Sequence, residues 1–287
     1  MKPRNRPPHQ RSPEGTQRSP HPINETRPIP RDTAAAIQGV KDLKQNFGLI
    51  LDRFASWRPE TPWSLGNDSK VKFTEKDQGK MIFSFDLDAH KSLLSAHQRR
   101  WKKILEHYAN TGYRISHFQL HSATRVIVGL GADSVLETNI RLHRVYGFPI
   151  IPASALKGVC RAYAKLIDGR ADDDEEFTEV FGKPPPDAAA GKVIFFDAIP
   201  ADPNALRLEL DVMNPHYSSY YQGNDAPADY LNPVPIFFLT IAPCQPFLFA
   251  VAGKDDRLAQ LAQTWLQEAL QNMGIGAKTT SGYGLWR

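Results

Sequence analysis

The chain has 287 residues, of which 41% are apolar and 23% are charged, so it has enough apolar material for a folded core. No apolar run approaches the ~18 residues that span a bilayer, and no apolar segment typical of a secretory signal opens the sequence. Cys160 and Cys244 form no C-x-x-C pair, which disfavours a zinc site and favours a reducing, cytoplasmic location.

The positive charge of the chain is concentrated at its beginning. Residues 1–31 carry seven Lys or Arg side chains against two Glu side chains, a local excess larger than the net charge of +4 of the whole chain. The remainder is near neutral, so overall basicity does not indicate a nucleic-acid partner. The Pro, Arg, Ser and Gln content of residues 1–32 predicts a disordered, solvated basic tail.

Residues 33–112 are predicted to form a helical N-terminal extension. Helical spacing runs from Thr33 to Trp57, residues 71–87 are strand-like, and Asp88 can cap a helix that ends at about Asn110. This last helix carries cations around an aromatic ring, a pattern that can bind single-stranded nucleic acid. The favoured interpretation is a solvated face with Trp101 turned to the core, flanked by Arg99, Arg100, Lys102 and Lys103.

A β-rich block follows, and then a helix with unusual chemistry. Residues 115–130 and 135–145 are predicted strands, and Glu137, Arg141 and His143 share one face of the second, as on an edge or ligand-facing strand. After Pro152, Ser154 is a plausible N-cap for a helix whose apolar stripe runs to Ile167. Three cations lie four residues apart on another face: Lys157, Arg161 and Lys165.

Gly158 lies inside this predicted helix, where glycine costs roughly 1 kcal/mol relative to alanine. The close approach of another backbone, from protein or RNA, would compensate for that cost. The alternative is an ordinary amphipathic helix with a solvated Lys/Arg face.

The second half of the chain alternates between polar and apolar segments. Residues 168–179 are predicted to be a solvated acidic linker and not a metal site, because no histidine accompanies the run. Strands are predicted at 192–199, at 206–212 as its partner, and at 235–241 and 246–252. A long aromatic loop separates the predicted strands at 206–212 and 235–241. An amphipathic helix is predicted from Asp255 or Asp256 to Met273, with Gly274 as its C-cap.

The chain ends in a glycine-rich loop that also carries a lysine and three hydroxyls. Gly274, Gly276, Gly282 and Gly284 surround Lys278, Thr279, Thr280 and Ser281. Consecutive exposed amides in such a loop form an anion-binding nest, and the combination suits a phosphodiester backbone. The spacing is neither that of a Walker A loop nor that of a dinucleotide fingerprint. A plain glycine-rich connector is the alternative.

From residue 113 onward, the order of elements is typical of an α+β protein. It predicts a ferredoxin-like (RRM-type) β-α-β-β-α-β core with insertions over 113–287, a sheet type that can bind single-stranded RNA. Both helices of this topology pack on one face of the sheet. The start of the Ser154–Lys165 helix and the 274–284 loop could therefore meet at one edge.

Several of these segments together resemble the RAMP superfamily of CRISPR proteins. They are Gly129-Leu-Gly131, Ile151-Pro-Ala-Ser-Ala-Leu-Lys-Gly-Val-Cys-Arg161 and Gly274-Ile-Gly-Ala-Lys-Thr-Thr-Ser-Gly-Tyr-Gly284. Asp211-Val-Met-Asn-Pro-His-Tyr-Ser-Ser-Tyr-Tyr221, with Pro233-Val-Pro-Ile-Phe-Phe-Leu239, is similar to the family of sixth subunits of type III-B (Cmr) effector complexes. Ala155 departs from the family pattern, which often has Ser or Thr there.

The resemblance implies a non-catalytic subunit that contacts guide RNA near its 3′ end in antiviral defence, with no cofactor and no metal. Implied partners are guide RNA, target RNA, the filament backbone subunit, a neighbouring capping RAMP subunit and a small helical subunit. The expected RNA-binding residues are Ser154, Lys157, Gly158, Arg161, His216, Gly274, Gly276, Lys278, Thr279, Thr280, Ser281, Gly282 and Tyr283. Tyr217, Tyr220 and Tyr221 are the expected protein-docking residues.

Two other functions remain open from the sequence. A metal-independent endoribonuclease that processes CRISPR transcripts would need a general base and acid, for which His121, His143 and His216 are the candidates. A pure scaffold would use the 214–232 loop as a docking surface for a neighbouring subunit.

Overall fold

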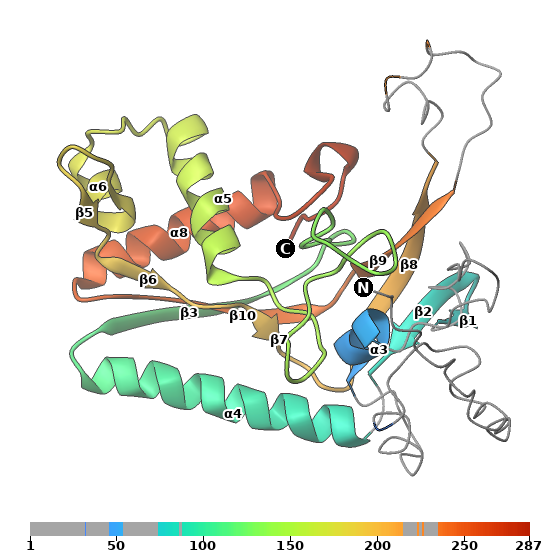
Figure 1. Cartoon of the computed structure of the whole chain (residues 1–287). Helices are drawn as coiled ribbons and strands as arrows, with labels where there is room; N and C mark the ends of the chain where they lie inside the picture. Colours follow the sequence, from blue (N-terminus) through green and yellow to red (C-terminus); the bar gives the residue numbers. More distant parts are fainter. Residues whose placement is uncertain are drawn as a thin grey trace, which may run out of the picture.

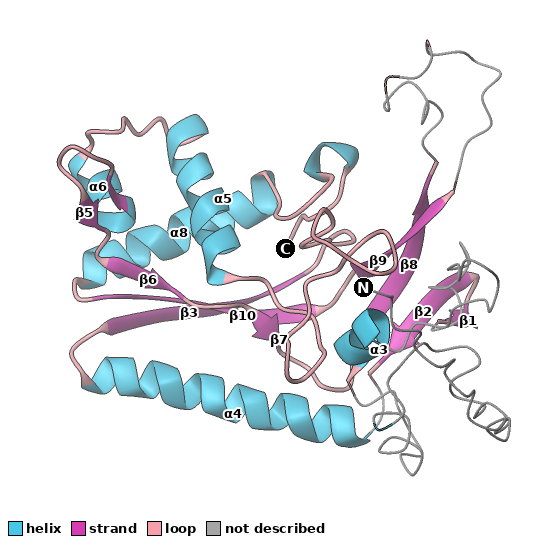
Figure 2. Ribbon diagram, in the orientation of Figure 1, coloured by secondary structure: helices cyan, strands magenta, loops and turns pink. Residues whose placement is uncertain are grey.

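The structure is a computed structural model that describes residue 32 and residues 46–53, 74–85, 88–214, 223, 226 and 235–287. The predicted basic tail, most of the predicted first helix and the aromatic part of the 214–232 loop lie outside the described residues. The described part mixes helices with antiparallel strands (Figure 2), as expected for an α+β protein.

A four-stranded antiparallel sheet forms the centre. Its order is β3 (Arg114–His121), β10 (Pro246–Gly253) and β6 (Val193–Phe195), and the short β7 (Ile199–Pro200) also pairs with β10. The end of the chain runs antiparallel beside β3, because Ser122 forms a bridge with Trp286 and the backbones of His121 and Arg287 exchange hydrogen bonds of 2.8 and 2.9 Å. The predicted strand at 115–130 is present only as far as His121, since residues 122–130 are irregular, and the predicted strand at 192–199 is divided into β6 and β7.

Helices cover both faces of this sheet (Figure 1). α5 (Ala153–Leu166) and α8 (Asp256–Asn272) pack together on one face, and α4 (Asp88–Asn110) lies along the other. Asp255 caps α8 by accepting a hydrogen bond from the Arg257 amide, and Gly274 (φ 72°) follows the helix, as predicted. Trp101 of α4 is 6% exposed and its indole donates to the Asp197 carbonyl at 3.2 Å, so the prediction of a core side chain is confirmed.

A second antiparallel sheet has the order β1 (Glu75–Asp77), β2 (Lys80–Ser84), β8 (Arg207–Met213) and β9 (Ile236–Ile241). The predicted pairing of 206–212 with 192–199 is wrong, because β8 pairs with β2 and β9 instead. The alternation of apolar and polar residues places Glu209 on the polar face of this strand. In the structure Glu209 is only 3% exposed, because Lys80 (2.9 Å) and Arg125 (2.7 Å) neutralise its carboxylate and allow that face to be covered. α3 (Phe47–Arg53) packs Phe47 against Phe83 of β2.

The predicted strand at 135–145 is also wrong. The segment is irregular, with Glu137 in the left-handed region (φ 64°) and one isolated bridge between Leu142 and Pro149. Its buried side chains are Leu136 and Ile140, while Thr138 and Leu142, which would share their face in a strand, are only partly buried. The backbone of this segment pairs with another irregular segment, since the Arg141 amide donates to the Val128 carbonyl at 2.7 Å.

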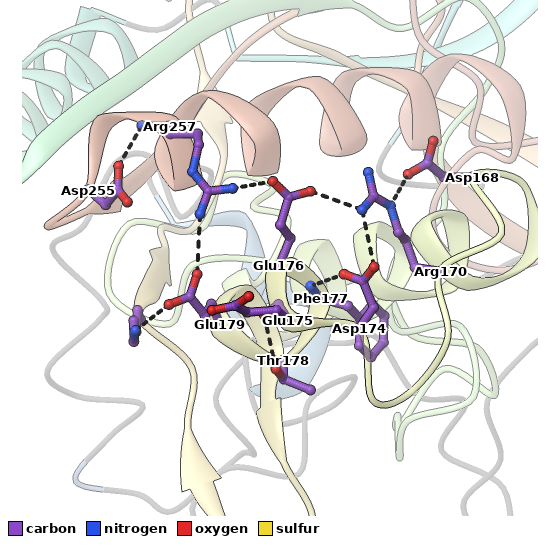
Figure 3. Close-up of polar contacts among 11 residues, drawn as sticks. Asp168, Arg170, Asp174, Glu175, Glu176, Phe177, Thr178, Glu179, Asp255 and Arg257 are labelled. Atoms are coloured by element: carbon purple, nitrogen blue, oxygen red, sulfur yellow. Dashed lines mark hydrogen bonds and ion pairs between the residues drawn. The ribbon is translucent and has the colours of Figure 1, made fainter.

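The acidic stretch is an ordered structure and not a solvated linker (Figure 3). It contains α6 (Glu175–Phe181), which is capped by Asp174 and buries Phe177, Val180 and Phe181 at helical spacing. Its carboxylates are neutralised by neighbouring cations: Arg170 contacts Asp168, Asp174 and Glu176, Arg257 contacts Glu176 and Glu179, and Lys192 contacts Glu179. The short hairpin of β4 (Gly182–Lys183) and β5 (Ala189–Ala190) follows.

The described residues contain neither a candidate metal site nor a candidate membrane span. None of their groups of His, Cys, Asp and Glu could hold a metal ion. None of their helices is long and apolar enough to cross a membrane.

Candidate nucleic-acid interface

The first part of the candidate interface is one face of α5, here called the α5 outer face, formed by Ser154, Lys157, Gly158, Arg161 and Lys165. The opposite face is buried through Leu156, Cys160 and Tyr163 against α8 and the sheet. The Cys160 thiol lies 3.7 Å from the Ala262 carbonyl, and burial raises its pKa. α8 therefore fixes the orientation of the outer face.

Ser154 is not the N-cap, contrary to the prediction. α5 begins one residue earlier, Pro152 occupies the cap position, and the Asp197 carboxylate accepts the Ala153 amide at 2.7 Å. This carboxylate already compensates the partial positive charge at the N-terminus of the helix, so the N-terminus attracts a phosphate only weakly. Ser154 lies in the first turn of α5, where it is exposed to solvent and does not cap the helix.

Gly158 is exposed, and a side chain added there would meet nothing within 4 Å. No backbone from the described part of this chain comes close enough to explain a glycine in the middle of a helix. The described residues therefore leave two of the explanations from the sequence: an approaching backbone that they do not include, or a solvated face of an ordinary amphipathic helix. The surface around Gly158 is open to such a partner.

The three cations of the α5 outer face differ in how free they are. Arg161 lies 3.6 Å from Asp172 and 5.4 Å from the centre of the Phe177 ring, and Lys165 pairs with Asp172 at 2.8 Å. The hydrogen bond from Lys165 lowers the pKa of Asp172. Within the described residues Lys157 has no ion pair. Lys157 is therefore the cation most available to a phosphate.

The second part of the candidate interface is the glycine-rich loop. A side chain at Gly276 would overlap the Ile127 carbonyl, and one at Gly284 would overlap the Ile275 carbonyl. Gly274 has little room either, because Gly284 lies 2.9 Å from the position of its missing Cβ. These three glycines pack the loop onto its own chain, as the connector alternative predicted. Gly282 alone among the four has open space around it.

Most amides of the loop are used internally. Those of Gly274, Ile275, Ala277, Ser281, Gly282, Tyr283 and Gly284 all donate to carbonyls of the chain. The consecutive amides of Lys278, Thr279 and Thr280 have no acceptor among the described residues. Lys278 is left-handed (φ 61°, ψ 29°) and leads into the 3₁₀ turn η3 (Thr279–Ser281), a geometry typical of anion-binding nests. The predicted cradle thus narrows to residues 278–280.

Tyr283 is held in place beside this nest. Its hydroxyl donates to Asp211 at 2.7 Å, and burial together with this hydrogen bond raises the pKa of Tyr283 to about 12. The Phe238 ring lies 6.1 Å from the Tyr283 ring and 5.7 Å from the Lys278 ammonium group. The partly exposed ring is available for stacking, but the phenol is engaged within the chain.

One irregular segment joins the two parts of the interface (Figure 1). The Ala277 amide donates to Ile127 at 2.8 Å, the Arg141 amide to Val128 at 2.7 Å, and the Ile150 amide to Arg141 at 3.3 Å. Ile150 lies three residues before the start of α5. These three hydrogen bonds therefore connect the glycine-rich loop to the start of α5, two regions far apart in sequence, through residues 125–151.

Of the three histidines of the endoribonuclease alternative, the structure describes His121 and His143. His143 Nδ1 accepts hydrogen bonds from the Val145 and Tyr146 amides, both at 3.2 Å, and its ring neighbours His97 at 4.9 Å. His121 is exposed at the end of β3, where its backbone pairs with Arg287. His216 and the docking tyrosines Tyr217, Tyr220 and Tyr221 lie outside the described residues.

Sequence reasoning did not find Asp197 or His97. Asp197 accepts the first amide of α5 although it lies 44 residues away in the sequence. His97 lies on α4, which is held near Asp197 by its next residue, Gln98, through hydrogen bonds to the carbonyls of Pro200 and Ala201. Neither residue belongs to a motif, and no local spacing could have indicated them.

Comparison with known proteins identifies the family. The RAMP superfamily model matches residues 119–287. The CRISPR system Cmr subunit Cmr6 of Pyrococcus furiosus is 33% identical over 288 residues, with 76% of this chain and 84% of the relative covered. The chain belongs to the RAMP superfamily as a type III-B Cmr6-like protein.

Other Cmr6-like matches agree with this assignment. The CMR subunit Cmr6 of Saccharolobus solfataricus is 30% identical over 177 residues, covering 61% of this chain and 58% of the relative. A chain in the cryo-EM structure of type III-B Cmr-beta bound to cognate target RNA matches with a TM-score of 0.58 and 27% identity. That match covers 71% of this chain but only 66% of the other, just under two thirds of its length.

Proposed function

We propose that this Cmr6-like chain is a non-catalytic RNA-binding and assembly subunit of a type III-B Cmr ribonucleoprotein, and that it contacts guide RNA near its 3′ end. The observation that carries the proposal is the open surface at Gly158 beside the unpaired Lys157. A hydrogen-bonded segment connects that surface to the free amides of residues 278–280.

The two parts supply complementary phosphate contacts. At the α5 outer face, Lys157 and Arg161 supply positive charge, Ser154 a hydroxyl, and Gly158 the room for a sugar–phosphate backbone. At the loop, the nest of Lys278, Thr279 and Thr280 can donate amide hydrogen bonds to a second phosphate. Contacts of this kind position RNA and carry little sequence preference, which suits a subunit that must accept any guide.

We also infer that β3, α5, β6, β10, α8 and residues 285–287 form the β-α-β-β-α-β core of the ferredoxin-like fold. The strand order and the chain end beside β3 support this assignment. The helices of this core carry the interface on one face of the sheet. Its remaining surfaces are available to the proposed protein partners, which are the filament backbone subunit, a capping RAMP subunit and a small helical subunit.

The non-catalytic part of the proposal is supported by His143. Its Nδ1 is occupied by two backbone amides, and burial lowers its pKa. Such a group serves the local turn and is a poor candidate for shuttling protons. Incubation of the purified chain with repeat RNA is expected to give no cleavage product, and a product that disappears in His143→Ala would contradict this expectation.

The RNA contacts are tested in the assembled complex. The triple variant Lys157→Ala, Arg161→Ala, Lys278→Glu is expected to reduce the guide RNA retained per complex, most strongly at high salt, because phosphate contacts are salt-sensitive. A matched control makes the same charge change at exposed positions away from the interface: Lys183→Ala, Arg114→Ala and Lys76→Glu. Equal RNA retention in the two variants would refute the proposed contacts.

A further inference from the structure

A cavity of about 660 Å³ opens between α3 and residues 139–144. Two guanidinium groups, an imidazole and an amide line it together with an apolar floor that includes Leu51 and Ile150. Its polar side chains are Asn139, Arg141, His143, Arg144 and Asp197. The volume lies within the range of ~300–1,000 Å³ typical of small-ligand pockets and is sufficient for a nucleotide.

The two arginines of this cavity are exposed and have no ion pair among the described residues. Arg125, Arg170 and Arg257 each contact two or more carboxylates, whereas neither arginine of the cavity is compensated in this way. Arg141 and Arg144 are thus two uncompensated cations at one cavity. Paired guanidinium groups of this kind are suited to a phosphate.

The cavity shares part of its lining with the segment that connects the two parts of the interface. Arg141 belongs to the hydrogen-bonded path that joins the glycine-rich loop to the start of α5. Asp197 lines the cavity and also accepts the Ala153 amide at the first residue of α5. Asp197 and residues 141–151 therefore connect the cavity to the start of α5.

The charges within the cavity determine how a nucleotide would sit. The Asp197 carboxylate repels a phosphate, so the phosphate must remain at the rim with the arginines. Asn139 can both donate and accept at the edge of a base. His143 has Nδ1 occupied by two amides, which leaves its Nε2 as a donor, and its ring stacks on Tyr146 at 4.5 Å.

We propose that this cavity takes one unstacked nucleotide of the bound RNA, with the phosphate against Arg141 and Arg144 and the base inside beside Asn139 and His143. The inference rests on the proposed function, because it requires RNA along the α5 outer face. It adds a binding site and a chemical class of ligand, a single splayed-out nucleotide. Recognition of RNA in this way is common where bases are unstacked.

Photocrosslinking tests the inference in the assembled complex. The complex is purified from cells grown with 4-thiouridine, irradiated, and its crosslinked peptides are identified by mass spectrometry. Crosslinks are expected in peptides that contain Leu49 and residues 139–144. Leu49→Trp, which places a large ring at a half-exposed position of the cavity wall, is expected to reduce these crosslinks about tenfold, since base stacking contributes ~1–3 kcal/mol.

The double variant Arg141→Ala, Arg144→Ala gives an independent test that does not depend on how the tryptophan folds. It is expected to reduce the same crosslinks and to preserve those at α5 and at residues 278–280. Its control is Arg114→Ala, Lys183→Ala, which removes equal charge elsewhere. Crosslinks at α5 without any in the cavity would overturn this inference but leave the proposed function standing. Absence of crosslinks from the whole chain would overturn both.

Discussion

His97 and His143 form a neutral pair between α4 and the irregular segment. Their ring centres are 4.9 Å apart, and Tyr146 and Phe148 surround the His97 ring. Burial is the main reason that the pKa of His97 falls to about 4, with contributions from His143 and Arg100 and an opposing one from Asp197. Burial also lowers the pKa of His143. Both rings are therefore accommodated without charge.

The pair makes folding stability depend on pH. In the unfolded chain His97 binds a proton near pH 6.5, whereas in the folded chain it does so only near pH 4. Unfolding thus takes up a proton between these values, so the stabilisation is complete above pH 6.5 and is lost as the pH falls toward 4. His97→Phe is expected to reduce the slope of the unfolding free energy against pH by up to ~1.4 kcal/mol per pH unit in this window.

Urea denaturation at several pH values between 4.5 and 7 measures this slope, within the window given by the shifted pKa of His97. His107→Phe is the control, because it replaces an exposed histidine near the end of the same helix. The explanation is wrong if both variants change the slope equally.

At the scale of elements, α5 has a buried face that fixes its position and an outer face that contains a glycine in the middle of the helix. Leu156 and Cys160 are fully buried, yet Gly158 between them is exposed and touches nothing. A helix selected for stability alone would have alanine at that position. The glycine therefore costs helix stability, and the proposed passage of an RNA backbone over the outer face would account for it.

Gly158→Ala separates the two roles. Alanine fits without contact, so the free energy of unfolding of the isolated chain is expected to rise by about 0.5–1 kcal/mol. In the assembled complex the added methyl group occupies the surface proposed for the RNA backbone, so guide RNA retention is expected to fall. Chemical denaturation and quantification of co-purified RNA measure the two effects.

Ser92→Ala, at an exposed position of α4, is the control for a gain in helix propensity away from the interface. A stabilised Gly158→Ala variant with unchanged RNA retention would contradict the role of the α5 outer face.

Periodicity predicted the elements that bury one face and failed where burial depends on distant partners. α8 and β10 could be predicted because their apolar side chains recur at the spacing of a helix and a strand. α6 was missed because its charges suggested a linker, whereas Arg170 and Arg257 neutralise them from elsewhere in the chain. At the candidate site, Lys157 and Lys278 could be found from motifs, but the internal use of the loop amides could not.

At the scale of the whole molecule, the described segments at residues 74–85 and 88–112 pack against the part of the chain that follows them. β2 pairs with β8, the Lys80 ammonium group contacts the buried Glu209, and α4 covers one face of the central sheet. The match to the RAMP superfamily begins only at residue 119. The family-matching part is therefore in direct contact with residues that precede the predicted division at residue 112.

Truncation tests whether the family-matching part depends on these contacts. A fragment of residues 113–287 loses Trp101 and Leu105 from the core and leaves Glu209 without one of its two cations. Uncovering such large side chains costs ~3–5 kcal/mol each, a substantial part of the ~5–15 kcal/mol that stabilises a typical domain. We expect this fragment to lack a cooperative thermal transition, whereas residues 74–287, which keep β1, β2 and α4, should melt cooperatively. Circular dichroism melts of the two fragments decide between an integrated fold and an independent domain, since a sharp transition in the shorter fragment would show that α4 and β2 are accessory.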